Sequence, residues 1–347
     1  MACKLWDLLI RLSREGSREE VKAKSWGMLF HHAACNHREV IALYPHTPMK
    51  TSSRSCFVLL TALAATVLFS IGAQAQDASL TIKDVPRATQ AGEGPGKYVA
   101  PVPAKADLPT LWLIGDSTVR NGSKGDNGPT GQWGWGAPIV AYFDLGKINV
   151  VNRAFGGTSS RTFYRDDFWK NVKPLLKKGD FVLMQFGAND NGGAKGKGGL
   201  GGIDDKTEMN NTETVHTYGW YLKQLVAETK AAGATPIICS LTPRKVWEAD
   251  GKFKHGDNHA TWAGQVAQET GTAFVPLNEI IAEKYESLGK EKVDALYVPT
   301  PKENLHTGWD GAVVNAGCVI AGLKALPANP LASYLSVRAD AIAAWKK

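Results

Sequence analysis

The chain has 347 residues, with 40 Lys and Arg against 33 Asp and Glu, so its formal net charge is +7. Residues 1–75 hold nine of the basic and five of the acidic residues, which leaves a mildly basic 31 against 28 in residues 76–347. That segment is long enough for one globular domain, and its weak charge excludes a nucleic-acid-binding stripe, so we expect no nucleic-acid partner.

Residues 49–75 have the pattern of a secretory signal peptide. A basic stretch begins at Met49, residues 57–72 are almost wholly apolar, and Ala73-Gln74-Ala75 has the small-x-small form of a cleavage site. The apolar run is shorter than the roughly twenty residues that a membrane-spanning helix needs, although an uncleaved anchor is the alternative. We therefore interpret residues 1–48 as a mis-assigned upstream extension. We expect a periplasmic or extracellular protein without stable membrane association after cleavage.

Strands and helices alternate along the rest of the chain. Residues 76–108 are rich in Gly, Pro, Ala and Lys and predict an extended arm before a domain at 109–347. Apolar runs predict strands at 111–114, 148–151, 181–186, 236–241 and 273–275. Helical patterns cover 137–143, 166–176, 214–232, 260–269, 277–288 and a last helix that begins with a Thr307-x-x-Asp310 capping box. This alternation predicts an α/β fold, a three-layer sandwich around a central parallel sheet of about five strands.

The glycine-rich segment 194–205 contains Gly196-x-Gly198-x-x-Gly201, which formally matches a dinucleotide-binding fingerprint. No strand leads directly into it, no helix opens on it, and the position about twenty residues further on is Tyr221 rather than an acid. We therefore predict a mobile surface loop and no nucleotide cofactor.

Cysteine and histidine patterns give no sign of a metal site. The chain contains neither His-Glu-x-x-His nor Cys-x-x-Cys, so we expect no metal and no other cofactor. Cys239 and Cys318 are the cysteines that remain after residue 75. In an exported protein they would either pair or stay as two buried thiols, and the sequence leaves both possibilities open.

The apolar run Leu111-Trp112-Leu113-Ile114 ends at Gly115-Asp116-Ser117-Thr118. A strand covered on both faces is continuously apolar, and the carboxyl ends of such strands line the ligand crevice of open α/β sheets. Ser117 is therefore a candidate nucleophile. The alternative is a simple turn, since all four residue types favour turns.

Two further loops follow strands at the same sheet edge. Gly157 offers a backbone N–H and Asn189 a side-chain amide. Together with the N–H of Ser117, they would form an oxyanion hole, which stabilises the negative oxygen that develops during acyl transfer.

A serine nucleophile needs a base, and His306 is our candidate among the four histidines of residues 76–347. Glu303 lies three residues earlier, where its carboxylate can turn back and hold the imidazole in one tautomer. The rival Asp310 is engaged by the predicted capping box. Asp294, or a Ser/His pair without an acid, is the remaining alternative to Glu303.

These segments resemble the four conserved blocks of the SGNH (GDSL) hydrolases. The fuller pattern in residues 109–325, which includes Gln132-Trp133-Gly134-Trp135-Gly136, is similar to rhamnogalacturonan acetylesterases. The resemblance implies an SGNH/flavodoxin-like sheet, Ser117 as nucleophile and His306 as base. It also implies Asn189 and Gly157 as oxyanion donors, with Gly156 as the fallback. Glu303 stands where the family usually has Asp.

The resemblance implies a secreted serine esterase that removes O-acetyl groups from pectic rhamnogalacturonan through an acetyl-enzyme intermediate. Trp133, Trp135 and Arg161 are candidate substrate-binding residues, because rings stack on sugars and a guanidinium pairs with a uronate carboxylate. The alternatives are an esterase acting on acetyl-xylan, a lipid or a thioester, and a non-catalytic carbohydrate-binding protein with the same fold. The expected partner is acetylated plant cell-wall polysaccharide, bound by a monomer.

Overall fold

Five parallel strands form the central sheet of the computed structural model, which describes residues 100–121 and 131–347. From one edge to the other they are β2 (Asn149–Asn152), β1 (Thr110–Gly115), β3 (Phe181–Gln185), β6 (Thr235–Cys239) and β7 (Ala273–Val275). Every pairing between neighbours is parallel. The predicted α/β class and parallel sheet are thus confirmed. The expected upstream extension, signal peptide and most of the arm lie outside the described residues.

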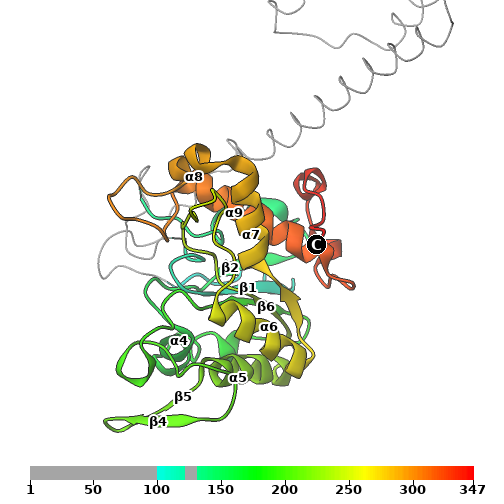
Figure 1. Cartoon of the computed structure of the whole chain (residues 1–347). Helices are drawn as coiled ribbons and strands as arrows, with labels where there is room; N and C mark the ends of the chain where they lie inside the picture. The colour runs from blue at the N-terminus through cyan, green and yellow to red at the C-terminus, as the bar shows by residue number, and fades with distance from the viewer. Residues whose placement is uncertain (1–99, 122–130) are drawn as a thin grey trace, which may run out of the picture. The chain divides into compact units, whose positions relative to one another are not determined.

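Helices cover both faces of this sheet (Figure 1). One face carries α4 (Ser160–Arg165), α5 (Tyr218–Ala231) and α6 (Asn258–Thr270). The other carries α7 (Leu277–Leu288), α8 (Lys290–Leu296) and α9 (Trp309–Ala325). Short 3-10 helices occupy Pro138–Tyr142, Lys173–Leu175, Gly193–Lys195, Ala332–Tyr334 and Val337–Ala341. No helix in the described part of the chain is long and apolar enough to cross a membrane.

Alternate residues of β1 enter two separate hydrophobic cores. Leu111 and Leu113 pack in the core that α7 and α9 share with the sheet. Trp112 and Ile114 point to the opposite face, into the core formed with α5 and α6. All four side chains are fully buried. This explains why the strand reads as one apolar run rather than as an alternating pattern.

Two predicted helices differ from the observed elements. Instead of a helix over 166–176, the structure has the earlier α4, capped by Ser159, whose side chain accepts a hydrogen bond from the Thr162 N–H. The capping signal lay in the segment that we interpreted as loop. Residues 166–176 are interrupted by Asp167, which has a φ of +41°, and keep only the 3-10 turn at Lys173–Leu175.

The predicted helix at 214–232 begins only at Tyr218. Residues before it form β5 (Glu213–His216), which pairs with β4 (Thr207–Asn210) in an antiparallel hairpin. Asn211, between the two strands, has a φ of +54°, a conformation in which asparagine is favoured over most residues. Thr217 then caps α5 by accepting a hydrogen bond from the Trp220 N–H.

The predicted capping box at Thr307 is wrong. Gly308 is the N-cap of α9 and offers no side chain, while the Thr307 hydroxyl donates to the carbonyl oxygen of Trp133 at 3.0 Å. Thr307 therefore ties the start of α9 to a distant loop. Cys239 and Cys318 are also settled by the fold, because both are buried and neither forms a disulfide.

We expect replacement by alanine to have opposite effects on stability at two glycines of α9. A Cβ on Gly322 would overlap Val275 and come within 2.9 Å of Ile280 Cδ1, whereas a Cβ on Gly317 would lie 3.7 Å from Ile342 Cδ1, an ordinary contact. Gly322→Ala should destabilise by roughly 1–3 kcal/mol through overpacking. Gly317→Ala should stabilise by up to about 1 kcal/mol through helix propensity. Urea unfolding measures both, and equal effects would contradict the packing of α9 on β7.

Candidate active site

Ser117 lies in a tight turn at the carboxyl end of β1. The carboxylate Oδ1 of Asp116 accepts hydrogen bonds from the Thr118 N–H at 2.8 Å and the Thr118 hydroxyl at 2.7 Å, which holds the turn closed. A Cβ on Gly115 would come within 2.5 Å of the Gln185 carbonyl oxygen, so glycine allows β1 and β3 to approach here. The chain leaves β1 for β2 on one side and then crosses to β3 on the other. Such a switch point opens a crevice at this edge.

Ser117, His306 and Glu303 form a continuous hydrogen-bonded relay. The Ser117 Oγ lies 2.9 Å from His306 Nε2, and His306 Nδ1 lies 3.1 Å from Glu303 Oε2. The other carboxylate oxygen of Glu303 accepts from the backbone N–H groups of Leu305 at 2.8 Å and His306 at 2.9 Å. The Glu303 carboxylate is thereby held with its other oxygen directed at the imidazole of His306. A proton on Nδ1 leaves Nε2 free to accept from the serine.

Hydrogen bonding keeps Glu303 ionised. Partial burial acts to raise the pKa of this carboxyl, but the N–H groups of His306 and Leu305 and the imidazole outweigh burial and hold the pKa below its usual value. An anion at this position favours the imidazolium that forms when His306 takes a proton. The longer side chain of Glu, compared with Asp, still reaches the ring.

The three expected oxyanion donors come from three different loops. Gly157 has a φ of +81°, which favours glycine. In residues 100–121 and 131–347 no acceptor pairs with the N–H of Ser117 or of Gly157. The Asn189 Nδ2 donates one hydrogen to the carbonyl of Thr158 at 3.0 Å, so a second N–H remains available.

The second and third of these loops are tied together by Asp190. Its carboxylate accepts from the Ser160 N–H at 3.0 Å and from the Ser160 hydroxyl at 2.5 Å, at the first turn of α4. Burial raises the pKa of Asp190 although the Ser160 hydrogen bonds oppose the shift. The bond between Asn189 and Thr158 adds a second link between the same loops.

A buried polar network behind Ser117 was missed by the sequence analysis. Gln185, the last residue of β3, accepts from the indole N–H of Trp135 at 2.7 Å and donates to the Thr118 hydroxyl at 2.6 Å. The same hydroxyl donates a hydrogen bond to the Asp116 carboxylate. The available signal was a single polar residue in the apolar run of 181–186, because a buried amide needs partners.

The expectation that Trp133 and Trp135 stack on sugar rings is wrong. Trp135 is 0% exposed and Trp133 only 3%. Trp133 packs edge-on against Trp309 with ring centroids 4.9 Å apart. Both indoles therefore belong to the core, where Trp135 orients the residues behind the nucleophile.

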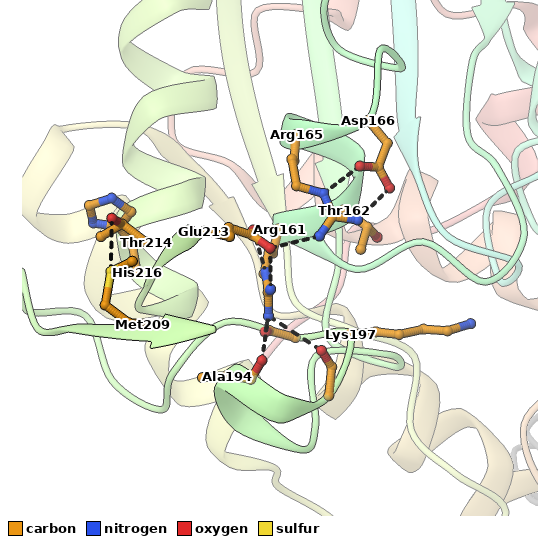
Figure 2. Close-up of polar contacts among 12 residues, drawn as sticks. Arg161, Thr162, Arg165, Asp166, Ala194, Lys197, Met209, Glu213, Thr214 and His216 are labelled. Carbon is orange, nitrogen blue, oxygen red and sulfur yellow. Dashed lines mark hydrogen bonds and ion pairs between the residues drawn. The ribbon is translucent and has the colours of Figure 1, made fainter. Parts of the chain in front are cut away.

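Arg161 does not face the crevice either, since it is 1% exposed. Its guanidinium pairs with both carboxylate oxygens of Glu213 and donates to the backbone carbonyls of Ala194, Gly196 and Gly198 (Figure 2). The prediction that Arg161 binds substrate is thus wrong for this structure. The glycine-rich segment, which we predicted to be mobile, is instead anchored by a buried charge.

Among the described residues, no group of three or more His, Cys, Asp or Glu side chains could hold a metal ion.

The lowered pKa of Glu303 predicts a pH-dependent contribution to stability. Its ionised form stabilises the fold above the ordinary value of 4.5, and this contribution is lost as the pH falls through the lower folded-state pKa. Glu303→Gln should therefore reduce the free energy of unfolding more at pH 7 than at pH 3.5. Urea unfolding at both values measures the difference, with Glu291→Gln as an exposed control. The same cost at both values would contradict the relay.

Several known proteins are similar to this chain in sequence. The GDSL-like lipase/acylhydrolase family matches residues 113–308. A rhamnogalacturonan acetylesterase of Emericella nidulans is 30% identical over 60% of this chain and 81% of its own. The probable rhamnogalacturonan acetylesterase YesY of Bacillus subtilis is 29% identical over 62% of this chain and 93% of its own.

A solved structure supports the fold. The crystal structure of Bacillus subtilis protein YxiM has a TM-score of 0.52 and 24% identity, covering 62% of this chain and 56% of that one. The family match spans more than half of the chain and includes all four segments of the site. The chain therefore belongs to the GDSL-like lipase/acylhydrolase family and is a carboxylic ester hydrolase.

Proposed function

We propose that the protein is an exported serine acetylesterase that removes O-acetyl groups from pectic polysaccharide, with rhamnogalacturonan as its substrate. One observation carries the catalytic part of the proposal. Ser117, His306 and Glu303 are joined by hydrogen bonds, and the loops after β1, β2 and β3, which carry the N–H groups of Ser117, Gly157 and Asn189, end at the same edge of the sheet. This is the arrangement that acyl transfer to a serine requires.

In the first half of the reaction, the Ser117 Oγ attacks the acetyl carbonyl carbon while His306 Nε2 accepts the hydroxyl proton. The carbonyl electron pair moves to oxygen, and the N–H groups of Ser117, Gly157 and Asn189 hold the resulting oxyanion. Losing one such donor typically costs about 10²–10³ in rate. When the tetrahedral intermediate collapses, the C–O bond to the sugar breaks and His306 returns the proton to the leaving alkoxide.

In the second half, water replaces the sugar alcohol. His306 takes a proton from water, whose oxygen attacks the acetyl-serine carbonyl, and the same donors hold the second oxyanion. Collapse breaks the bond to Ser117 Oγ, which regains its proton from the imidazolium. Acetic acid leaves and ionises to acetate in water, and Glu303 stays ionised throughout as the partner of the ring.

The relatives support the choice of substrate. Two proteins that match this chain over most of their own length are named as rhamnogalacturonan acetylesterases, one of them as probable. The polar, glycine-rich loops around Ser117 also suit a sugar ester better than a lipid, which would need a long apolar groove. We take the acting unit to be a monomer.

Replacing the nucleophile tests the proposal. Ser117→Ala should lower kcat/KM for p-nitrophenyl acetate by about 10⁴-fold or more while the protein stays folded. Ser287→Ala, which changes an exposed serine on α7, is the control. Acetate release from acetylated rhamnogalacturonan, acetylated xylan and a lipid ester then compares substrates. Equal or faster release from xylan or lipid would overturn the pectic assignment, and full activity of Ser117→Ala would overturn the mechanism.

The signal-like segment at 49–75 supports export to the periplasm or the medium. Expression from Met49 in a secreting bacterium should yield a mature protein that begins near Gln76. N-terminal sequencing of the exported material measures this. An exported protein that still begins at Met49, or retention of the protein in the cytosol, would contradict the proposal.

A further inference from the structure

The glycine-rich segment after β3 has a structural purpose that does not involve a nucleotide. A Cβ on Gly198 would overlap the backbone of Asp190, and one on Gly196 would come within 2.8 Å of the Asn191 carbonyl oxygen. Glycine therefore lets this segment pack directly on the loop that carries Asn189. The segment therefore lies against residues 190–192, directly after Asn189.

Hydrogen bonds from two buried side chains, Arg161 and Ser159, fix the backbone around Lys197. Arg161 donates to the carbonyls of Gly196 at 3.3 Å and Gly198 at 3.0 Å, one residue before and one after it. The carbonyl of Lys197 itself accepts from the Ser159 hydroxyl at 2.6 Å. Ser159 is fully buried and caps α4. The position of Lys197 is therefore set by the fold, although its side chain is exposed.

The Lys197 side chain extends away from the Arg161 cluster (Figure 2). Its Nζ lies 3.8 Å from the point that a Cβ on Gly157 would occupy. Since the N–H of Gly157 is an oxyanion donor in the proposed mechanism, the ammonium group lies close to the proposed oxyanion hole. A solvent-accessible cation at this place can pair with an anionic substituent that the substrate carries next to its acetyl group.

We propose that Lys197 binds a carboxylate of the substrate, so that the site prefers an acetylated uronic acid residue over its neutral methyl ester. This rests on the proposed function and names the chemistry that selects its substrate. Arg161, which we expected to contact the uronate, acts as a positioning residue. Its charge is compensated by Glu213, and its donors hold the loop that presents Lys197.

Binding to the inactive Ser117→Ala protein tests this without turnover. Calorimetry with an oligogalacturonate and with its methyl-esterified form gives two dissociation constants. Adding Lys197→Gln should weaken binding of the charged oligomer by about five-fold, as expected for one partly exposed ion pair, and leave the methyl ester within about two-fold. Lys195→Gln, two residues earlier and also exposed, is the matched control and should leave both constants within about two-fold. Lys197→Arg should retain the preference.

Salt provides a second readout that a merely structural role would not change. Raising NaCl should weaken binding of the charged oligomer to the Lys197 protein more than to Lys197→Gln, because screening acts on the ion pair. Equal affinity for the two oligomers before substitution, or equal weakening of both by Lys197→Gln, would overturn the Lys197 site. Either result leaves ester hydrolysis untouched, whereas failure to release acetate from pectin overturns only the proposed substrate.

Discussion

The active site depends on the parallel sheet, because parallel strands end at the same edge. β1, β2 and β3 are neighbours in the sheet, and the loops after them carry Ser117, Gly157 and Asn189. The chain adds β2 on one side of β1 and then β3 on the other side. At such a switch point, the loops that follow neighbouring strands diverge and leave a crevice between them. His306, the proposed base, lies in the loop just before α9. Strand order thus brings the loops of Ser117, Gly157 and Asn189 to one edge of the sheet.

Hydrogen bonds among groups that take no part in the reaction then fix the positions of the loops that carry Ser117, Gly157 and Asn189. Gln185, Thr118 and Asp116 hold the nucleophile turn, and Asp190 binds Ser160 across the neighbouring loops. Buried polar groups of this kind are costly when unpaired, so they favour a single arrangement. An oxyanion hole works only if its donors already point at the developing charge. The polar network behind the crevice therefore supports the rigidity that acyl transfer needs.

Arg161 shows how burial changes the role of a charged residue. A guanidinium removed from water needs compensation, which Glu213 and three backbone carbonyls supply, so no donor is directed at the substrate. The same contacts hold the backbone of the glycine-rich segment at 194–198 in place. Lys197, between two of the anchored carbonyls, is exposed and is the residue that we propose for recognition of a substrate carboxylate.

Local patterns in the sequence were enough to predict the parallel sheet and the polar residues that follow its strands. Apolar runs and the spacing of Glu303 and His306 are properties of short segments, and the structure contains both the parallel strands and the hydrogen bond between these two residues. The sequence alone did not predict the burial of Trp135 and Arg161, the β4–β5 hairpin in place of a helical turn, or the hydroxyl of Thr307 bonding to Trp133. The hairpin pairs residues at most nine positions apart, whereas the contacts of Trp135, Arg161 and Thr307 involve partners about 50 to 170 residues away. Tertiary packing decides such contacts, because exposure and hydrogen-bond partners follow from what lies nearby in space.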